Sequence, residues 1–246
     1  MLYLSLLRLV GGMRDLRYHQ VQAEAYLAQG HFGLALIELE LARKIASRAT
    51  REDGKLEGNV ESISKIISEI KKRFVPLVAE NVVLRRAEEL DAEQIHRAHM
   101  KSINEICSKD HSKEEIRVWG GRKYDPNFRI PAINGQFYVV VECEDQIEGF
   151  CQLEVSARED EKTARLKGLF VTPKILHKKV GAALIGLVFE YCRSLDIQKI
   201  TLRSSFTAFD FYKKCGFVQT GEIEETLREG VGLRGFPMEW VDTNIL

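Results

Sequence analysis

The chain has 246 residues, of which 45% are hydrophobic and 29% are charged, and this composition excludes a disordered or membrane-embedded protein. Lysine and arginine together number 36, as do aspartate and glutamate, so no net positive field attracts nucleic acid. The five cysteines form no CxxC pair, which argues against a disulfide framework and a zinc site. Reduced thiols in a cytoplasmic protein without a membrane partner are expected.

Residues 1–79 are predicted to form an all-helical segment. Its apolar start, MLYLSLLRLV, is too short to span a bilayer and lacks the basic region of a secretory signal, so an amphipathic first helix is favoured over a targeting role. Two helical runs follow and join at Gly30, and Asn59 is the expected N-cap of a third. The third run carries an apolar stripe at helical spacing, made of Val60, Ile63, Ile66, Ile67 and Ile70.

The first helical pair resembles a single tetratricopeptide repeat. The residues on the small and aromatic packing positions of that repeat are Ala23, Tyr26, Gly30, Phe32, Ala35, Leu39 and Ala42. One repeat cannot bury its own face, and the sequence shows no second copy. The pair is therefore either a helical hairpin that packs on the rest of the chain or on a partner, or part of a peptide-binding array. A homodimer or a protein partner would use these helices.

Residues 80–246 show strands interleaved with helices, which predicts a mixed α/β domain. A strand and turn at 81–91 precede a helix at 91–109 whose inner side carries Ile95, Ala98, His99, Ile103 and Ile106. A short helix capped by Ser112 follows, and then a strand pair at 136–145 and 146–157. The remaining runs are a strand at 164–173, a long helix, a strand at 199–204, a helix ending at Gly216, and strands at 218–227 and 235–242.

Two segments of this second part carry a family resemblance. LFVTPKILHKKVGAAL and, further on, TAFDFYKKCGF resemble the GNAT superfamily of acetyl-CoA-dependent N-acetyltransferases, and the order of elements over about residues 81–242 is similar throughout. The resemblance implies a mixed, mostly antiparallel sheet flanked by helices. It also implies acetyl-CoA as co-substrate, no metal, and acetyl transfer to a primary amine of a small molecule or peptide by direct attack through a tetrahedral intermediate.

The long helix has two possible registers against the phosphate-binding motif of that family, which is Gln or Arg, two residues, Gly, one residue, and Gly or Ala. Spacing alone places Lys178, Gly181 and Ala183 on the motif. Helical phase favours a register in which Leu176 takes the Gln or Arg position and Lys179 that of the first glycine. The stripe buried in this register comprises Val180, Ala183, Leu184, Leu187, Val188 and Tyr191.

Backbone N–H groups at a helix N-terminus bind phosphate, and any residue but proline supplies one. The segment that the resemblance assigns to the coenzyme diphosphate comprises His177, Lys178, Lys179, Val180, Gly181 and Ala182. The alternative is a solvated pair of lysines before a core helix. If position 179 requires positive φ, its side chain costs about 1 kcal/mol or more.

The strand before this helix contains Gly168, which indicates a bulge or a splayed edge. By resemblance, this strand separates from the next one, and Leu169, Phe170 and Val171 pair with the pantetheine arm through their free backbone groups. Phe170 can also pack in the core, and both roles are compatible. Thr207 stands where similar proteins often carry asparagine, and its hydroxyl can bond one pantetheine group.

The resemblance assigns to Tyr212 the protonation of the departing thiolate, and Phe211 beside it is expected in the core. Glu154 is the candidate general base, the alternative being a solvent-facing strand residue. His96 and His99, three residues apart, could form a metal pair, but they lack a clear third ligand, and partial burial is the favoured alternative.

Arg165 and Lys167 on the strand at 164–173 could favour a substrate with a carboxylate. The sequence thus predicts a cytoplasmic acetyltransferase whose amine and acetyl-CoA enter from opposite sides of the sheet. The alternative is a catalytically weak or inactive acyl-CoA-binding regulatory or scaffold protein that uses its helical N-terminus for partners.

Overall fold

The computed structural model describes residues 13–53, 57–73, 81–158 and 161–242. Contacts divide the chain into two units, Met1–Arg86 and Ala87–Leu246, and each unit is described by itself. The amphipathic helix predicted at the very start of the chain lies outside the described residues. No helix among the described residues combines the length and the apolar character that a membrane crossing requires.

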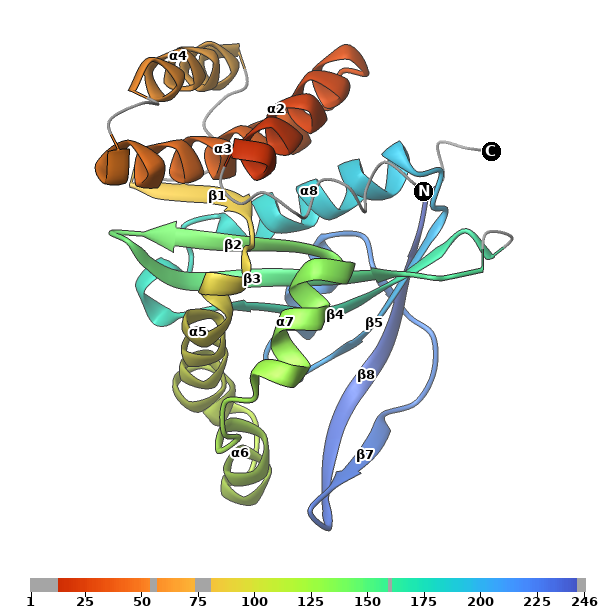
Figure 1. The fold of residues 1–246 in the computed structure, drawn as a ribbon. Coiled ribbons are helices and arrows are strands. Elements are labelled where there is room, and N and C mark those ends of the chain that lie inside the picture. Colours follow the sequence, from red (N-terminus) through yellow and green to blue (C-terminus); the bar gives the residue numbers. More distant parts are fainter. Residues whose placement is uncertain (1–12, 54–56, 74–80, 159–160, 243–246) are drawn as a thin grey trace. The chain divides into compact units, whose positions relative to one another are not determined.

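The first unit comprises the helices α2 (Met13–Ala28), α3 (Phe32–Asp53) and α4 (Glu57–Arg73) and the strand β1 (Val82–Arg86) (Figure 1). Gly30 joins α2 to α3 with a φ of 79°, a conformation that glycine adopts without steric cost. The two helices predicted on either side of Gly30 are therefore confirmed. The buried core of this unit consists of Leu16, Ala23, Ala35, Leu39, Ala42, Ala46, Ile63, Ile67 and Ile70.

Two details of the α4 prediction differ from the structure. Asn59 lies inside the helix, because α4 already begins at Glu57, so the predicted N-cap is wrong. Glu57 is the better helix former, and no proline precedes Asn59 to stop the helix extending backward. Ile66 is 43% exposed although Ile63, Ile67 and Ile70 on the same predicted stripe are buried, because Ile66 lies at the edge of the apolar face.

The second unit is built on a mixed sheet in the order β2-β3-β4-β5-β8-β6, with β7 paired to β8 (Figure 1). The strands are β2 (Phe137–Cys143), β3 (Gln146–Val155), β4 (Thr163–Val171), β5 (Lys199–Ser204), β6 (Val218–Gln219), β7 (Glu224–Arg228) and β8 (Val231–Val241). The pair β4–β5 is parallel, whereas β2–β3, β3–β4, β5–β8, β6–β8 and β7–β8 are antiparallel. The predicted mixed and mostly antiparallel sheet is confirmed.

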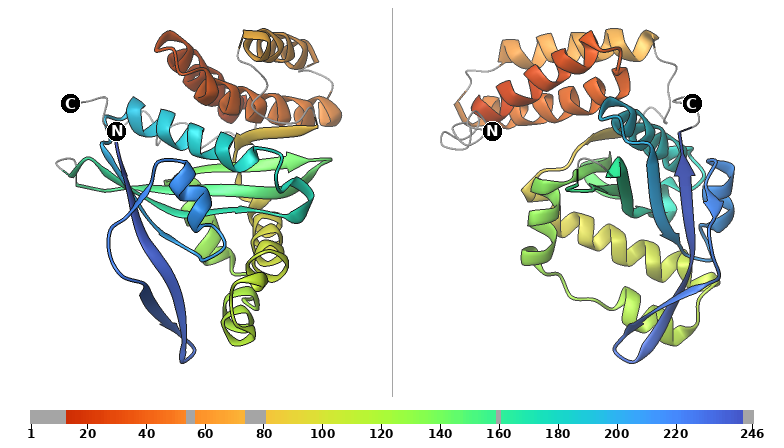
Figure 2. Two further views of the ribbon diagram at one scale, coloured as in Figure 1. Left: turned by 180° about the vertical axis from the view of Figure 1, so that it is seen from behind. Right: turned by 90° about the vertical axis from the view of Figure 1, so that its right-hand side faces the viewer.

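Helices cover both faces of this sheet. One face carries α5 (Ala92–Glu105), α6 (Lys113–Gly120) and α7 (Pro126–Gly135), and the other carries α8 (Val180–Ser194) and α9 (Phe209–Lys214) (Figures 1 and 2). Short 3-10 turns lie at Glu89–Asp91, Cys107–Lys109 and Pro173–Ile175. The core between β2, β3 and α5 comprises Ala92, Ile95, Ala98, Ile133, Tyr138, Val140, Ile147 and Phe150.

Local signals explain where several of these elements begin. Ser112 caps α6 as predicted, since its Oγ accepts from the Glu115 N–H at 3.2 Å and its own N–H donates to the Glu115 carboxylate at 2.8 Å. Helix α7 was not predicted, although its start carries a cap in Asp125 and a proline at the first helical position. The strand predicted at 218–227 is two strands, β6 and β7, separated by the residues around Gly221.

Candidate active site

Strands β4 and β5 separate beside the centre of the sheet. Their parallel register runs from Thr163 opposite Lys199 to Arg165 opposite Thr201, and β4 continues to Val171 without β5. The backbone groups of residues 166–171 that face β5 therefore have no strand partner on that side among the described residues. Such groups on an edge can pair with an extended ligand.

A bulge accompanies this separation. Gln152 pairs with Gly168 and the next residue, Leu153, pairs with Leu166, which leaves Lys167 as the extra residue of β4. The bulge predicted from Gly168 is therefore present, centred one residue earlier. At Gly168 a Cβ atom would lie 3.2 Å from the Phe170 ring, so glycine lets that ring fold back over the strand.

The segment after β4 leads into the N-terminus of α8. Lys179 is the N-cap residue, and the first helical hydrogen bond runs from the Ala183 N–H to the Lys179 carbonyl at 3.1 Å. The N–H groups of Val180, Gly181 and Ala182 precede this bond and have no helical acceptor. The predicted stripe is confirmed at Val180, Ala183, Leu184, Leu187 and Val188, which are buried, while Tyr191 is half-buried and its ring stacks on Phe137.

Two residues of this segment adopt a left-handed conformation. Lys179 has φ 60° and ψ 7°, and His177 has φ 63°. The position that carries Lys179 thus does require positive φ, at the cost expected for a residue with a Cβ atom. The side chains of His177, Lys178 and Lys179 are exposed, so their charged or polar ends face solvent beside the helix N-terminus.

Gly181 lets α9 approach α8. A Cβ atom at this position would lie 3.1 Å from the Phe211 ring, so a larger residue would require that ring to shift. Phe211 is half-buried in this contact, whereas Tyr212 is only 6% exposed. The core role predicted for Phe211 therefore belongs more fully to Tyr212, because Tyr212 is the residue that turns inward, against Phe217.

Tyr212 and Thr207 place two hydroxyl groups on this side of the sheet. Burial raises the pKa of Tyr212 above its usual value, and nearby Cys151 adds to the rise, so the phenol keeps its proton. The Thr207 Oγ1 atom is buried and has no hydrogen-bond partner of normal geometry among the described residues. It lies beside the Cys107 thiol, whose pKa burial raises to about 11. A buried hydroxyl without a partner is unfavourable unless a ligand supplies one.

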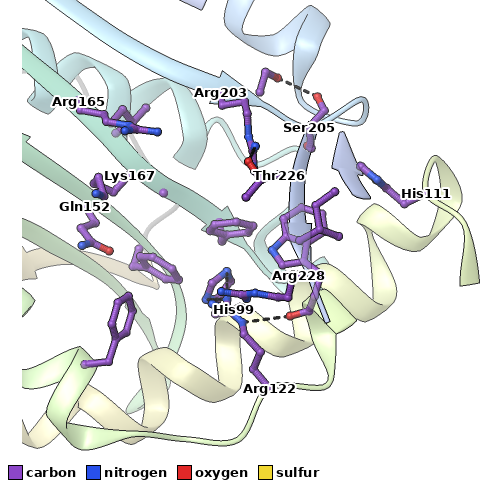
Figure 3. A pocket seen from close by; sticks show the side chains of 18 of the residues that line it. His99, His111, Arg122, Gln152, Arg165, Lys167, Arg203, Ser205, Thr226 and Arg228 are labelled. Carbon is purple, nitrogen blue, oxygen red and sulfur yellow. Dashed lines mark hydrogen bonds between the residues drawn. The ribbon is translucent and has the colours of Figure 1, made fainter. Parts of the chain in front are cut away.

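A cavity of about 520 Å³ opens on the face of the sheet that α5, α6 and α7 cover (Figure 3). Its walls come from these helices, from β3, β4 and β5, and from the β7–β8 hairpin. The cationic side chains that line it are Arg122, Arg129, Arg165, Lys167, Arg203, Arg228 and Arg234. No carboxylate lines the cavity within the described part of the chain, so its interior is strongly positive.

Arg122, Arg129 and Arg228 form a cluster around His99, which we call the arginine cluster. Figure 3 shows Arg122 and Arg228 beside His99, with Arg165, Lys167 and Arg203 elsewhere along the wall. An Nη2 atom of Arg122 and one of Arg129 each lie 3.4 Å from the His99 Nδ1 atom. Burial, followed by the charges of Arg122 and Arg129, lowers the pKa of His99 well below its usual value, so the imidazole is neutral.

The cavity differs in several ways from what the sequence predicted. Arg165 and Lys167, which could favour a substrate with a carboxylate, do line the cavity. The arginine cluster was not predicted. His99 is 8% exposed, in line with burial, and the described residues contain no group of three side chains that could hold a metal. His96 is half-buried and is not part of the cavity wall.

Glu154, the predicted base, lies outside this cavity. It pairs with Arg165 in the β3–β4 register and lines a second hollow with Thr201. Its carboxylate accepts hydrogen bonds from Gln136 at 2.9 Å and from Lys167 at 3.2 Å. Lys167 lines the first cavity, so its bond to Glu154 connects the two hollows.

The splayed strands and the helix N-terminus on one side, and the cavity on the opposite face, offer two separate places for ligands. A family model described as the acetyltransferase (GNAT) domain matches residues 107–241, more than half of the chain. The chain therefore belongs to the GNAT acetyltransferase family and is an acyltransferase.

Solved structures of this family share the fold. A GCN5-related N-acetyltransferase from Rhodopseudomonas palustris is 21% identical with a TM-score of 0.59, over 67% of this chain and 98% of its own. The PaiA N-acetyltransferase of Thermoplasma acidophilum, solved in complex with coenzyme A, is 22% identical with a TM-score of 0.52, over 65% and 99%. A putative acetyltransferase from Salmonella typhimurium, solved with its cofactor acetyl-CoA, is 17% identical with a TM-score of 0.51, over 66% and 94%. No curated protein matches the sequence. At these identities the likeness establishes the fold and not the acceptor.

Proposed function

We propose that this acetyltransferase uses acetyl-CoA to acetylate a primary amine of a small molecule or peptide. The observation that carries the proposal is the separation of β4 from β5 directly before the free N-terminus of α8. An extended arm can pair with the exposed edge of β4 while an anionic group at its end reaches the helix. The cavity on the opposite face leaves room for the second substrate.

The coenzyme would be held mainly by backbone groups. The N–H groups of Val180, Gly181 and Ala182 would bind the diphosphate, with the helix dipole contributing about 0.3–1 kcal/mol per charge. The exposed His177, Lys178 and Lys179 side chains flank this position. The pantetheine arm would pair with Leu169, Phe170 and Val171, and the unpartnered hydroxyl of Thr207 would bond one of its amide groups.

Tyr212 would act as the general acid. The neutral amine attacks the thioester carbonyl, a tetrahedral intermediate forms, and backbone N–H groups of β4 stabilise its oxyanion. As the C–S bond breaks, Tyr212 gives its proton to the departing thiolate. The raised pKa of Tyr212 keeps the phenol protonated until that step. The amine loses its own proton to solvent at the mouth of the cavity.

We place Glu154 outside this mechanism because of its pairing with Lys167 at the cavity edge. An exposed pair of this kind contributes at most about 1 kcal/mol. We therefore expect the Glu154→Gln variant to lower kcat/KM by no more than about fivefold, with an unchanged pH profile. A loss of several hundredfold with a shifted acidic limb would restore the predicted role of base.

The test of the proposal is acetyl-CoA binding by calorimetry together with thiol release in the presence of a panel of amines. Tyr212→Phe should bind acetyl-CoA as the wild type does and lower kcat about 100-fold, within the range for a lost general acid. The matched control is Tyr124→Phe, whose side chain is 37% exposed and does not line the cavity. Coenzyme binding without transfer to any amine, and no effect of Tyr212→Phe, would favour the acyl-CoA-binding scaffold instead.

We further propose that residues 1–79 and 80–246 have separate roles, the first serving a protein partner or a second copy of the chain. Deletion of residues 1–78 should then leave acetyl-CoA affinity unchanged and remove the interaction. A loss of coenzyme affinity on deletion would contradict this division.

A further inference from the structure

We propose that the acceptor is a compact amine that also carries two negative charges, as a phosphate or as two carboxylates, and that Arg122, Arg129 and Arg228 bind these charges. This inference rests on the proposed transfer to an amine and names the class of that amine. It also goes beyond the exposed pair Arg165 and Lys167, because the arginine cluster includes the buried Arg129 and no carboxylate among the described residues lines the cavity beside it.

The strongest support is the burial of Arg129. Arg129 is 5% exposed, and its guanidinium donates to the Tyr138 hydroxyl at 2.7 Å, besides its contact with His99. Both partners are neutral, since burial raises the pKa of Tyr138 to about 12 and lowers that of His99. A buried cation is unfavourable unless an anion is paired with it, and no carboxylate on the described cavity wall does so.

Arg122 and Arg228 add two more positive charges beside Arg129. Burial, together with the charges of Arg228 and Arg129, lowers the pKa of Arg122 to about 10. The Arg122 side chain is held by its Nε donation to the Trp119 carbonyl at 3.2 Å, so it stays in the cavity rather than turning to solvent. Guanidinium groups held together against their repulsion bind phosphate and carboxylate through paired hydrogen bonds.

The other cations on the cavity wall differ from the arginine cluster in their partners. Lys167 lies 3.2 Å from Glu154, and Arg234 lies 3.4 Å from Glu115, so each has a carboxylate partner outside the cavity. Of the other two cations on the wall, Arg165 is exposed and Arg203 donates to the Thr226 hydroxyl. The most buried part of the deficit of negative charge therefore lies at the arginine cluster, which contains Arg129. A ligand with one negative charge would leave most of it uncompensated, which is why we infer a dianion.

The position of the cluster assigns it to the acceptor rather than to the coenzyme diphosphate. Residues 176–182 do not line this cavity, and they lead into α8, which lies on the opposite face of the sheet from α5, α6 and α7 (Figure 2). The His99 ring lies 4.2 Å from the ring of Phe170 on β4, the strand edge proposed for the pantetheine arm. An anionic group bound at the arginine cluster would therefore lie close to the proposed position of the thioester. The amine of such an acceptor must then be close to the acceptor's own charged groups. The cavity of about 520 Å³ has the size of a small-molecule site.

The experiment compares amines that differ in negative charge. Acetyl transfer is measured with O-phosphoethanolamine against ethanolamine, with glutamate against glutamine, and with spermidine as a cationic amine. We expect the dianionic member of at least one pair to have a kcat/KM roughly 10- to 100-fold higher, the range for hydrogen bonds to charged groups. The two pairs distinguish phosphate from dicarboxylate. A preference for neutral or cationic amines would overturn the inference and leave the proposed function standing.

Variants locate the effect. Arg228→Gln and Arg122→Gln should each lower kcat/KM for the preferred dianion at least about tenfold more than kcat/KM for the neutral amine. The control is Arg97→Gln on α5, whose side chain is 57% exposed and pairs with Glu93. An equal loss with charged and neutral amines, or the same loss in the control, would contradict the assignment.

Binding separates this inference from the proposed function. Calorimetry with inorganic phosphate and with succinate, at constant ionic strength, should show binding that Arg228→Gln weakens and that saturating coenzyme A leaves intact. Absence of anion binding overturns the inference whether or not the protein turns over acetyl-CoA. Loss of anion binding on addition of coenzyme A would assign the arginines to the coenzyme, which also overturns it. Failure to bind acetyl-CoA at all, with anion binding retained, would contradict only the proposed function.

Discussion

Replacement of Lys179 by glycine should stabilise the second unit although it removes a charge from the proposed phosphate site. Lys179 has φ 60°, and this conformation costs about 1–2 kcal/mol for a residue with a Cβ atom. Glycine removes that cost but increases the entropy of the unfolded chain, which offsets about 0.4–1 kcal/mol. The net gain is about 0.5–1 kcal/mol, equivalent to a rise in Tm of about 1–4 °C for a domain of this size.

Lys178→Gly is the matched control, since it removes an ammonium group from the same exposed segment at a residue without positive φ. This variant should be destabilised by about 0.5–1 kcal/mol, so that the two variants differ by about 1–2 kcal/mol. Both should weaken coenzyme binding about two- to fivefold through the lost charge.

Urea unfolding followed by tryptophan fluorescence provides the measurement. Both tryptophans, Trp119 and Trp240, lie in the second unit, so their emission reports on that unit alone. If Lys179→Gly is destabilised as much as Lys178→Gly, the positive φ carries no strain and the reasoning is refuted. A much larger loss of coenzyme affinity in Lys179→Gly alone would show that its side chain makes a specific contact.

Three further predictions concern other parts of the second unit. Thr207→Val should leave the free energy of unfolding unchanged or slightly higher, because the buried hydroxyl has no hydrogen-bond partner of normal geometry among the described residues. The variant should nevertheless weaken acetyl-CoA binding in calorimetry by a measurable factor, and unchanged binding would contradict the assigned contact. Burial alone would raise the pKa of Glu115, but hydrogen bonds from Ser112 and Arg234 outweigh it and lower the pKa to about 2. Because the folded pKa is the lower one, this stabilisation is present above about pH 4.5 and is lost as the pH falls toward 2, so Glu115→Gln should flatten the acid dependence of urea unfolding in that window. Of the five cysteines Cys215 alone is not buried, although partial burial raises its pKa, so a thiol reagent at pH 8 should label the native protein at this site before the other four. Cys215→Ser should abolish that first phase, and several thiols that react together would show that the core opens.

Much of the fold was predictable because its signals are local. The alternation of apolar residues identified the strands, and the Ser112 cap located α6. The wrong prediction of Asn59 as an N-cap has a local cause as well. Asparagine is a good capping residue, but at position 59 the helix has already begun. Helix α7 could have been predicted from Asp125 and Pro126, which are a cap and a first helical residue.

The sequence by itself determined the order of helices and strands along the chain and the helical phase of α8. It also determined that a lysine occupies position 179, where the backbone is left-handed. These features depend on neighbours a few residues apart, whose spacing is visible in one dimension. Only the tertiary structure decided that Arg122, Arg129 and Arg228 meet around His99, since they come from a loop, a helix and a distant hairpin. It also decided that Glu154 stays at the edge of the cavity and that Tyr212 turns inward. Burial and the field of distant charges arise from the packed sheet, and no local pattern encodes them.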